Sequence, residues 1–204
     1  MSDVFNTIET AVENIIFKEK SSKFIGYAFP VRDENEIKIH LERIKKLHHS
    51  ARHWCYAWQL GHGTKQHYRV NDDGEPNNSA GIPIYGQIQS HELTDVLVIV
   101  VRYFGGIKLG VGGLVQAYKT SAQLTLDEAV IIEKQITEHI QLQFDYKDMN
   151  KVMRLIKERK LHIINQLLEE DCRITIEVRQ SEAAAATAIF EAVYGVKWNR
   201  NIVI

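Results

Sequence analysis

The chain has 204 residues, of which 45% are hydrophobic and 25% are charged, and its formal net charge is −1 at pH 7. This composition excludes a largely disordered chain, and the near-neutral charge disfavours nucleic-acid binding driven by bulk positive charge. The longest unbroken apolar run, Val96–Val101, is far shorter than the roughly 20 residues of a membrane-spanning helix. Two cysteines, Cys55 and Cys172, are too few for a disulfide framework, and no apolar signal segment opens the chain. We therefore expect a cytoplasmic protein.

Two strands and a helix are predicted near the start of the chain. The segments Val12–Lys20 and Phe24–Val31 are predicted to form the strands. Asp33 with Glu36 three residues later is typical of a helix start. Apolar residues at helical spacing then predict an amphipathic helix over residues 34–48.

Two strands, a loop and a short helix are predicted next. The aromatic and apolar segment Ala51–Leu60 predicts a strand, and the polar, turn-rich segment Gly61–Ser79 predicts a loop. A glycine and a proline open a short predicted helix, Ile82–Ile88. The continuous β-branched and aliphatic run Val96–Val101 predicts a strand that is buried on both faces.

A glycine-rich segment then leads into a helix predicted from about Leu114 to Ala129. Its glycines are Gly105, Gly106, Gly110, Gly112 and Gly113. Free N–H groups between a buried strand and a helix start can bind an anion. The alternative is a tight corner packed against other backbone, in which Gly112 and Gly113 would resist substitution. The segment matches neither the Walker A loop nor the dinucleotide-binding fingerprint.

The last seventy residues predict the order β-α-β-β-α-β, which is the ferredoxin-like split-βαβ pattern. Ser181 is predicted to cap the second helix of this pattern, and Val130–Gln135 is predicted to be a short, stiff linker before it. The strands are predicted at 140–146, 161–168, 173–179 and 196–204, with helices around 152–156 and after Ser181. The fold class predicted for the whole chain is α+β.

Two clusters of polar residues raise the question of a metal site. Asp72, Asp73 and Glu75 can bind a hard cation or act as acid and base, although Asp-Gly and Pro are also ordinary turn residues. Six of the nine histidines fall between His40 and His67, but their spacing completes no zinc ligand set. We expect no bound metal.

His53 and Cys55 lie on the same face of a predicted strand. They allow a nucleophile pair, and the alternative is a packed aromatic wall. The strand before the glycines ends in Arg102, Tyr103 and Phe104, and Lys108 follows. Here a cation and an aromatic ring beside an anion-binding loop can recognise phosphate, nucleotide or carboxylate. The alternative is that Arg102 closes an ion pair. We expect substitution of Arg102 to affect binding more than folding.

A basic helix in the last third of the chain is a second candidate contact. Its candidate nucleic-acid contacts are Lys147, Lys151, Arg154 and Lys157. The alternative is the solvated face of an amphipathic helix.

Several of these motifs together resemble the IMPACT/YigZ family. They are Ala51-Arg52-His53-x-Cys55, Asp72-Asp73-Gly74-Glu75-Pro76, Ala80-Gly81-x-Pro83 and the run from Val100 to Leu114, with Arg102-Tyr103-Phe104-Gly105-Gly106 at its centre. The resemblance covers residues from about 15 to 125, and the C-terminal pattern extends it over nearly the whole chain. Because the last motif is long and gapless, the match is specific.

The resemblance implies a fold and a role. The fold is an N-terminal α/β sandwich, similar to the second domain of a small-subunit ribosomal protein, over residues 1–130, with a ferredoxin-like domain over 136–204. Eukaryotic relatives regulate translation by binding an activator of a starvation-responsive initiation-factor kinase. The implied role is non-enzymatic binding near translation. The implied partner is the ribosome, RNA or a translation-associated protein, with no cofactor, no membrane and no reading of DNA sequence.

The predicted binding surface of the first domain joins the basic, glycine and carboxylate groups described above. Its residues are Arg52, His53, Asp72, Asp73, Glu75, Arg102, Tyr103, Gly105, Gly106, Lys108, Gly110, Gly112 and Gly113. The alternative function is a nucleotide- or phosphometabolite-binding enzyme that uses Gly105–Gly113. It rests on analogy with kinases of the same fold superfamily, which hold phosphate on a glycine-rich loop.

Overall fold

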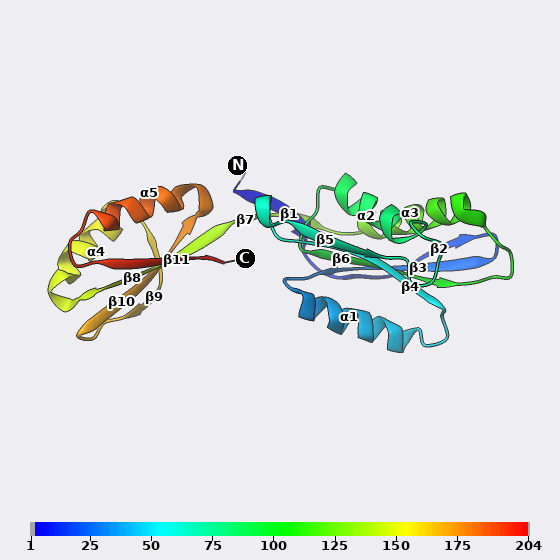
Figure 1. Ribbon diagram of the computed structural model, residues 1–204, viewed down its shortest axis with the longest axis horizontal. Helices are drawn as coiled ribbons and strands as arrows, with labels where there is room; N and C mark the ends of the chain where they lie inside the picture. The colour runs from blue at the N-terminus through cyan, green and yellow to red at the C-terminus, as the bar shows by residue number, and fades with distance from the viewer. Residues whose placement is uncertain (1–2, 204) are drawn as a thin grey trace. The chain divides into compact units, whose positions relative to one another are not determined.

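The computed structural model describes residues 3–203, and the chain divides into two compact units (Figure 1). One unit is Phe5–Lys134, and the other comprises residues 135–203 together with Asp3 and Val4. Both units combine β-sheets with helices, which confirms the predicted α+β class. No helix within residues 3–203 is long and apolar enough to span a membrane.

The first unit is built on a five-stranded antiparallel sheet with the order β2-β3-β6-β4-β5. The strands are β2 (Val12–Glu19), β3 (Ser22–Pro30), β6 (Val96–Tyr103), β4 (His53–Leu60) and β5 (His67–Asn71). β6 occupies the centre, and all its residues up to Arg102 are buried. This confirms the strand predicted from the continuous apolar run.

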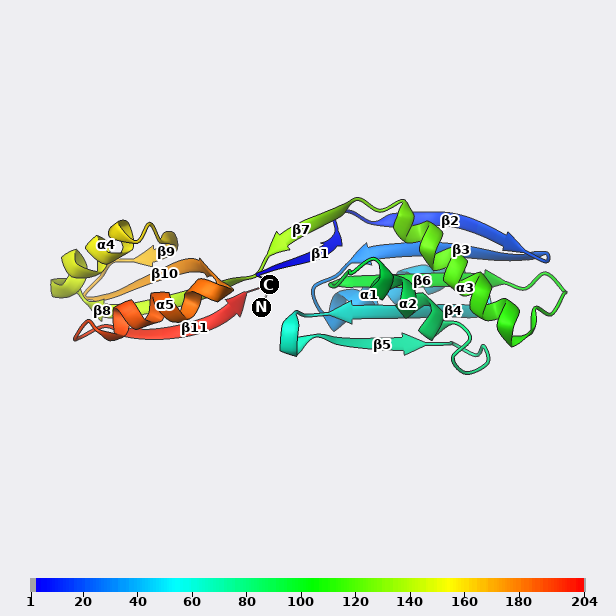
Figure 2. The ribbon, with the colours of Figure 1, turned by 90° about the horizontal axis from the view of Figure 1, so that it is seen from above.

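Helices cover both faces of this sheet. Helix α1 (Glu34–Leu47) packs on one face, while α2 (Gly81–Ser90) and α3 (Gly110–Asp127) lie side by side on the other (Figure 2). Alternate residues of β6 enter the two cores, with Val98 in the core of α2 and α3 and Ile99 in the core of α1. The sheet therefore separates two hydrophobic layers.

The predicted N-cap of α1 is confirmed. The Asp33 carboxylate accepts hydrogen bonds from the backbone N–H groups of Asn35 and Glu36, at 2.8 Å and 2.9 Å. These bonds satisfy two of the N–H groups that an α-helix leaves unpaired at its start.

Helix α3 begins at Gly110, four residues earlier than predicted. Gly112 and Gly113 thus lie in its first turn, and the prediction that they form a loop was wrong. Glycine has a low helix propensity, which explains the error. Packing overrides this propensity, because Leu109 and Leu114 on either side of the first turn pack against the core of α2 and α3.

Three strands were missed. β5 lies inside the segment predicted as a loop, and β1 (Val4–Ile8) pairs with β7 (Ile131–Gln135), which was predicted as a linker. Most side chains of β5 and β7 are exposed. Strands of this kind lack the alternation of apolar and polar residues by which a half-buried strand is detected.

The second unit has the predicted ferredoxin-like order. A four-stranded antiparallel sheet, β11-β8-β10-β9, carries two helices. The elements are β8 (Thr137–Asp145), α4 (Met149–Glu158), β9 (His162–Leu167), β10 (Asp171–Arg179), α5 (Gln180–Glu191) and β11 (Lys197–Val203). One core joins both helices to one face of this sheet.

The start of α5 differs from the prediction. The helix begins at Gln180, so Ser181 lies in its first turn and is not the cap. Asp3 performs the capping role: its carboxylate accepts hydrogen bonds from the backbone N–H of Ser181, at 3.0 Å, and from the Ser181 hydroxyl. The Asp3 carbonyl also accepts the N–H of Ile136, at 2.7 Å. A residue near the start of the chain therefore stabilises the C-terminal unit.

We propose that residues 136–204 form an independently folding domain. Expressed alone, this fragment is expected to unfold in one cooperative thermal transition, because its core of β8, α4, β10 and α5 is closed within itself. Loss of the Asp3 cap is expected to cost about 1 kcal/mol. Thermal melts followed by circular dichroism measure the cooperativity of the fragment. The same melts of Asp3→Ala in the full chain measure the loss of stability that is due to the missing cap. A fragment without a cooperative transition would show that the boundary is misplaced.

Candidate functional site

A cavity of about 390 Å³ opens beside the end of β6. Three segments line it: the start of β4, the turn that carries Glu75, and the stretch between β6 and α3. The lining residues are Arg52, His53, Glu75, Pro76, Arg102, Phe104, Lys108, Leu109, Gly110, Val111 and Leu114. The carboxylate turn and the glycine-rich segment, which are far apart in sequence, therefore meet here.

A buried ion pair lies at this cavity. The Arg102 guanidinium donates to Glu75 Oε1 at 2.7 Å, and the two side chains are only 6% and 4% exposed. The Tyr118 hydroxyl donates to the same oxygen at 2.8 Å. Burial raises the pKa of Tyr118, which keeps this hydroxyl protonated as a donor. Glu75 thus carries two strong hydrogen bonds inside the protein.

Arg102 fulfils both alternatives considered for it, because it closes an ion pair and also lines the cavity. Its Nε is buried and has no hydrogen-bond partner within residues 3–203. Removing one member of a buried pair leaves the other charge uncompensated, which typically costs about 3–5 kcal/mol. Substitution of Arg102 is therefore expected to destabilise the fold, contrary to the expectation from its position at a strand end.

His53 is oriented by the neighbouring turn. Its Nδ1 lies 2.9 Å from the carbonyl oxygen of Asp73. Because a carbonyl only accepts, Nδ1 carries the proton of this hydrogen bond. Nε2 lies 4.0 Å from Glu75 Oε1. The ring therefore lines the cavity next to the buried ion pair.

Asp72 and Asp73 hold the backbone together. The Asp72 carboxylate accepts the N–H groups of Asn78, Ala80 and Gly81 at 2.8–2.9 Å, which caps the start of α2. The Asp73 carboxylate accepts the N–H of Trp54 at 2.8 Å. Neither residue lines the cavity. Within residues 3–203 no three His, Cys, Asp or Glu side chains are arranged to hold a metal ion.

Cys55 is not suited to nucleophilic chemistry. Its side chain is fully buried, with Sγ 3.0 Å from the carbonyl oxygen of Asp72 and 3.3 Å from the Tyr118 hydroxyl. Burial raises the pKa of the thiol far above its usual range. Since the thiolate is the reactive form, the hypothesis of a His53–Cys55 nucleophile pair is wrong.

The glycine-rich segment serves two purposes. At Gly105 a β-carbon would lie 1.9 Å from the carbonyl oxygen of Ser21, so two backbone segments approach closely there. Gly106 and Gly110 have φ of +91° and +71°, which favour glycine. Gly112 has neither constraint. At Gly113 a β-carbon would lie 3.1 Å from Leu109 Cβ, so this position is closely packed. The prediction that Gly112 and Gly113 resist substitution is therefore wrong for Gly112, and the tightest part of the corner lies at Gly105–Gly110.

The start of α3 is free to contact an anion. Leu109 precedes the helix and supplies no side-chain cap, so the N–H groups of the first turn keep the partial positive charge of a helix N-terminus. Arg52 and Lys108 are exposed beside it, and neither has an ion-pair partner among the described residues. The cavity therefore gathers positive charge, while its own carboxylate is compensated by Arg102.

Exposed apolar side chains also line this positive cavity. Phe104 and Val111 are 50% and 56% exposed. The Phe104 ring centroid lies 5.4 Å from the Arg102 guanidinium carbon. The sequence analysis places Phe104 beside Arg102 and Tyr103 at a recognition surface, although Phe104 is not among the candidate binding residues of the first domain.

Tyr103 does not contribute to the cavity. Its hydroxyl lies 2.9 Å from His48 Nδ1, on the side of the sheet covered by α1. Successive residues of a strand point to opposite faces, so Arg102 and Tyr103 cannot share one site. The prediction that they act together was wrong.

The candidate contacts on the basic helix are mostly neutralised. Lys147 pairs with Asp145 at 2.9 Å, and Lys151 pairs with Asp148 at 3.0 Å. Arg154 lies 3.7 Å from Glu158. The remaining candidate, Lys157, has no ion-pair partner among the described residues.

Comparison with known proteins identifies the family. The family model described as the Impact N-terminal domain matches residues 20–126. The IMPACT family member YvyE of Bacillus subtilis is 32% identical over 88% of this chain and 82% of its own. The IMPACT family member YigZ of Escherichia coli is 31% identical over 91% and 89%. The chain belongs to the IMPACT family.

A solved structure supports the fold over the full length. It is described as a hypothetical protein and is 24% identical to this chain. The alignment covers 100% of this chain and 98% of the other, with a TM-score of 0.70. The same α+β fold is therefore found in a protein of low sequence identity.

Two glycine substitutions test the location of the tight corner. Gly105→Ala is expected to lower the free energy of unfolding by about 2 kcal/mol or more, because the new methyl group meets the Ser21 backbone. Gly112→Ala is the matched control and is expected to be neutral or stabilising by up to about 1 kcal/mol, since alanine favours helix. Urea unfolding of both variants measures the difference. Equal effects would contradict the assignment.

Cys55 and Tyr118 predict a loss of stability at alkaline pH. Burial raises both pKa values in the folded protein, so the unfolded chain loses these protons first as the pH rises. The free energy of unfolding is expected to be unaffected below about pH 8. Above this pH, each of the two groups is expected to lower it by up to about 1.4 kcal/mol for every pH unit. Urea unfolding from pH 7 to 10 should give a shallower loss for Cys55→Ala than for the parent. Parallel curves would exclude Cys55 as a source.

Proposed function

We propose that this protein is a non-enzymatic cytoplasmic binding protein that acts in or near translation, and that the cavity at the end of β6 binds a phosphate group of RNA, on the ribosome or free. The observation that carries the proposal is the convergence of Arg52, Lys108 and the uncapped first turn of α3 on one cavity. Because Arg102 compensates Glu75, these three positive groups have no opposing charge at the site.

The chemistry of the cavity favours binding over catalysis. The carboxylate that lines it, Glu75, is held by Arg102 and Tyr118. The nearest thiol, Cys55, is buried with its pKa raised. The carboxylates of Asp72 and Asp73 are occupied by backbone N–H groups. These groups are thus committed to holding the site in shape.

The form of the cavity suits a phosphate with an attached base. Helix N-termini and unpaired cations bind phosphate oxygens. The half-exposed ring of Phe104 at the rim offers a face on which an unpaired base can stack. The connection with translation rests on the resemblance to IMPACT proteins. This resemblance implies that the eukaryotic members of the family regulate translation. The alternative to RNA as the partner is a translation-associated protein that presents a phosphate or carboxylate group to the cavity.

A second candidate function is an enzyme acting on a nucleotide or phosphometabolite. Two observations favour it: the volume of about 390 Å³ is that of a small-ligand site, and His53 and Glu75 both line the cavity. Binding of a free nucleotide followed by its turnover would support this function. Its decisive variant is His53→Gln, which would abolish turnover while nucleotide binding persisted.

Lys108→Glu tests the proposed binding role. The variant is expected to weaken co-sedimentation with ribosomes, or binding to a single-stranded RNA probe, at least tenfold, since it removes an exposed cation that is close to the phosphate. The thermal midpoint is expected to be unchanged, because Lys108 makes no ion pair within residues 3–203.

Lys119→Glu is the matched control, because Lys119 is an exposed lysine of α3 that does not line the cavity. It is expected to change affinity less than twofold. Raised salt should weaken parent binding more steeply than that of Lys108→Glu, because the variant makes fewer phosphate contacts. Equal affinities of the two variants would overturn the proposed site.

A further inference from the structure

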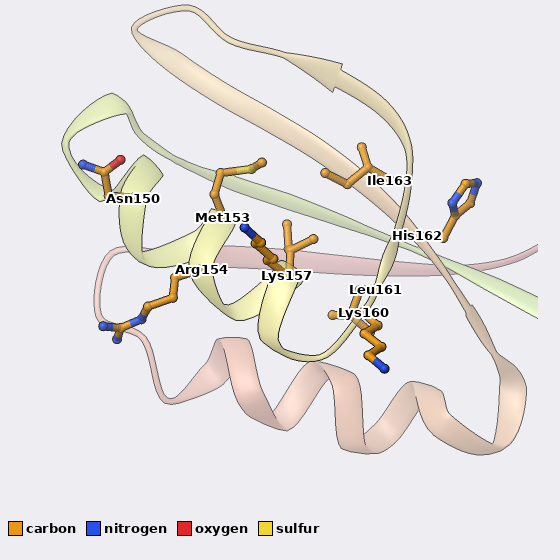
Figure 3. A pocket seen from close by; sticks show the side chains of 9 residues that line it. Asn150, Met153, Arg154, Lys157, Lys160, Leu161, His162 and Ile163 are labelled. Atoms are coloured by element: carbon orange, nitrogen blue, oxygen red, sulfur yellow. The ribbon is translucent and has the colours of Figure 1, made fainter.

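The second unit contains an open groove of about 700 Å³ between α4 and the first residues of β9 (Figure 3). Its lining is supplied by α4 and by the segment that leads from α4 into β9. The lining residues used below are Met153, Arg154, Lys157, Lys160, Leu161 and Ile163. None of the residues described along this groove is acidic.

The floor of the groove is apolar. Met153, Leu161 and Ile163 are half-buried and rest against the core of this unit. Figure 3 shows the Met153 and Ile163 side chains pointing toward one another. The flexible thioether of methionine adapts its shape to different apolar partners. The floor can therefore receive aliphatic side chains of varied shape.

The rim of the groove is positively charged. Lys157 and Lys160 are exposed, and neither has an ion-pair partner in the part of the chain that the structure describes. Arg154 has only a long contact of 3.7 Å with Glu158. A ligand with carboxylates would therefore find two cations, Lys157 and Lys160, that no described side chain already neutralises.

The groove also borders a free sheet edge. β9 is the last strand in the order β11-β8-β10-β9, so its outer backbone groups have no partner strand within residues 3–203. Ile164 and Leu167 on this strand are 40% and 46% exposed. A bulge leaves Ile164 without a partner in β10, which limits regular pairing at the edge to short segments. An exposed edge of this kind can accept one further strand.

We propose that this groove binds an extended acidic segment of a protein partner. The segment pairs with the edge of β9 at His162 and Ile163, places aliphatic side chains against Met153 and Leu161, and brings carboxylates to Lys157 and Lys160. Main-chain pairing and apolar contact supply affinity, while the cations select acidic sequences. This site is separate from the phosphate-binding cavity and does not depend on it.

The observations favour a peptide over RNA at this unit. Ferredoxin-like domains that bind single-stranded RNA stack bases on aromatic side chains of their central strands. The central strands β8 and β10 present residues such as Gln141, Gln143 and Thr175 on the open face, and no Phe, Tyr or Trp of these two strands lies there. The groove itself is lined by aliphatic side chains, which suit a peptide.

The test uses the full chain and three fluorescein-labelled probes. The first is a short peptide rich in glutamate and leucine, the second has lysine in place of each glutamate, and the third is an oligouridylate. Fluorescence anisotropy measures their affinities. The acidic peptide is expected to bind at least tenfold more tightly than either other probe. Slower amide hydrogen exchange at His162–Leu167 on its addition is the readout for strand pairing.

Charge reversal locates the site. Lys157→Glu with Lys160→Glu is expected to lower affinity for the acidic peptide at least tenfold. Lys134→Glu with Lys197→Glu makes the same change in net charge outside the groove, at two exposed lysines without an ion-pair partner among the described residues, and is expected to change affinity less than twofold. Met153→Gln, which keeps the charge, should also weaken binding. Circular dichroism confirms that each variant is folded.

Any of three results would overturn the proposal. The first is no binding of the acidic peptide, and the second is equal loss in the two double variants. The third is tighter binding of oligouridylate that is lost in Lys157→Glu with Lys160→Glu, which would assign the groove to nucleic acid.

Discussion

The buried ion pair between Arg102 and Glu75 is the interaction on which the first unit's site depends. It connects the end of the central strand β6 to the turn after β5, and Tyr118 joins α3 to the same carboxylate oxygen. Three separate segments are thereby held at fixed distances around one cavity. Because the pair lies in a low-dielectric interior, it is sensitive to the loss of either partner.

This arrangement explains why the positive charge at the cavity is available to a ligand. Glu75 would otherwise attract Arg52 or Lys108, but its strong hydrogen bonds are already made with Arg102 and Tyr118. The close backbone approach at Gly105 then brings the glycine segment to the same place, and α3 starts there without a side-chain cap. The second unit likewise has charged groups that are available to a ligand beside groups that stabilise the fold. Lys157 and Lys160 line its groove, and the apolar floor of the groove packs against the core.

The sequence predicted those elements of the fold whose signal lies within a short stretch of neighbouring residues. The Asp33 cap, the buried strand β6 and the β-α-β-β-α-β order each rest on a short window of sequence. The strands β1, β5 and β7 were missed because they are short and lack a clear apolar alternation. The cap that Asp3 provides for α5 joins residues 178 positions apart, so no local window contains it. For the site, the residue types were predicted and the partners were not. The contact of Arg102 with Glu75 joins residues 27 positions apart and depends on how the turn after β5 packs against the end of β6, which no local window contains.

A double-mutant cycle on the free energy of unfolding tests the central role of the ion pair most directly. Glu75→Gln, Arg102→Met and the double variant would be compared with the parent by urea unfolding. Each single change is expected to cost about 3 kcal/mol or more, because it leaves a buried charge unpaired. The double variant is expected to lose at least about 1 kcal/mol less than the sum of the two. If the two losses add within about 0.5 kcal/mol, Arg102 and Glu75 act independently and the account of the site is contradicted.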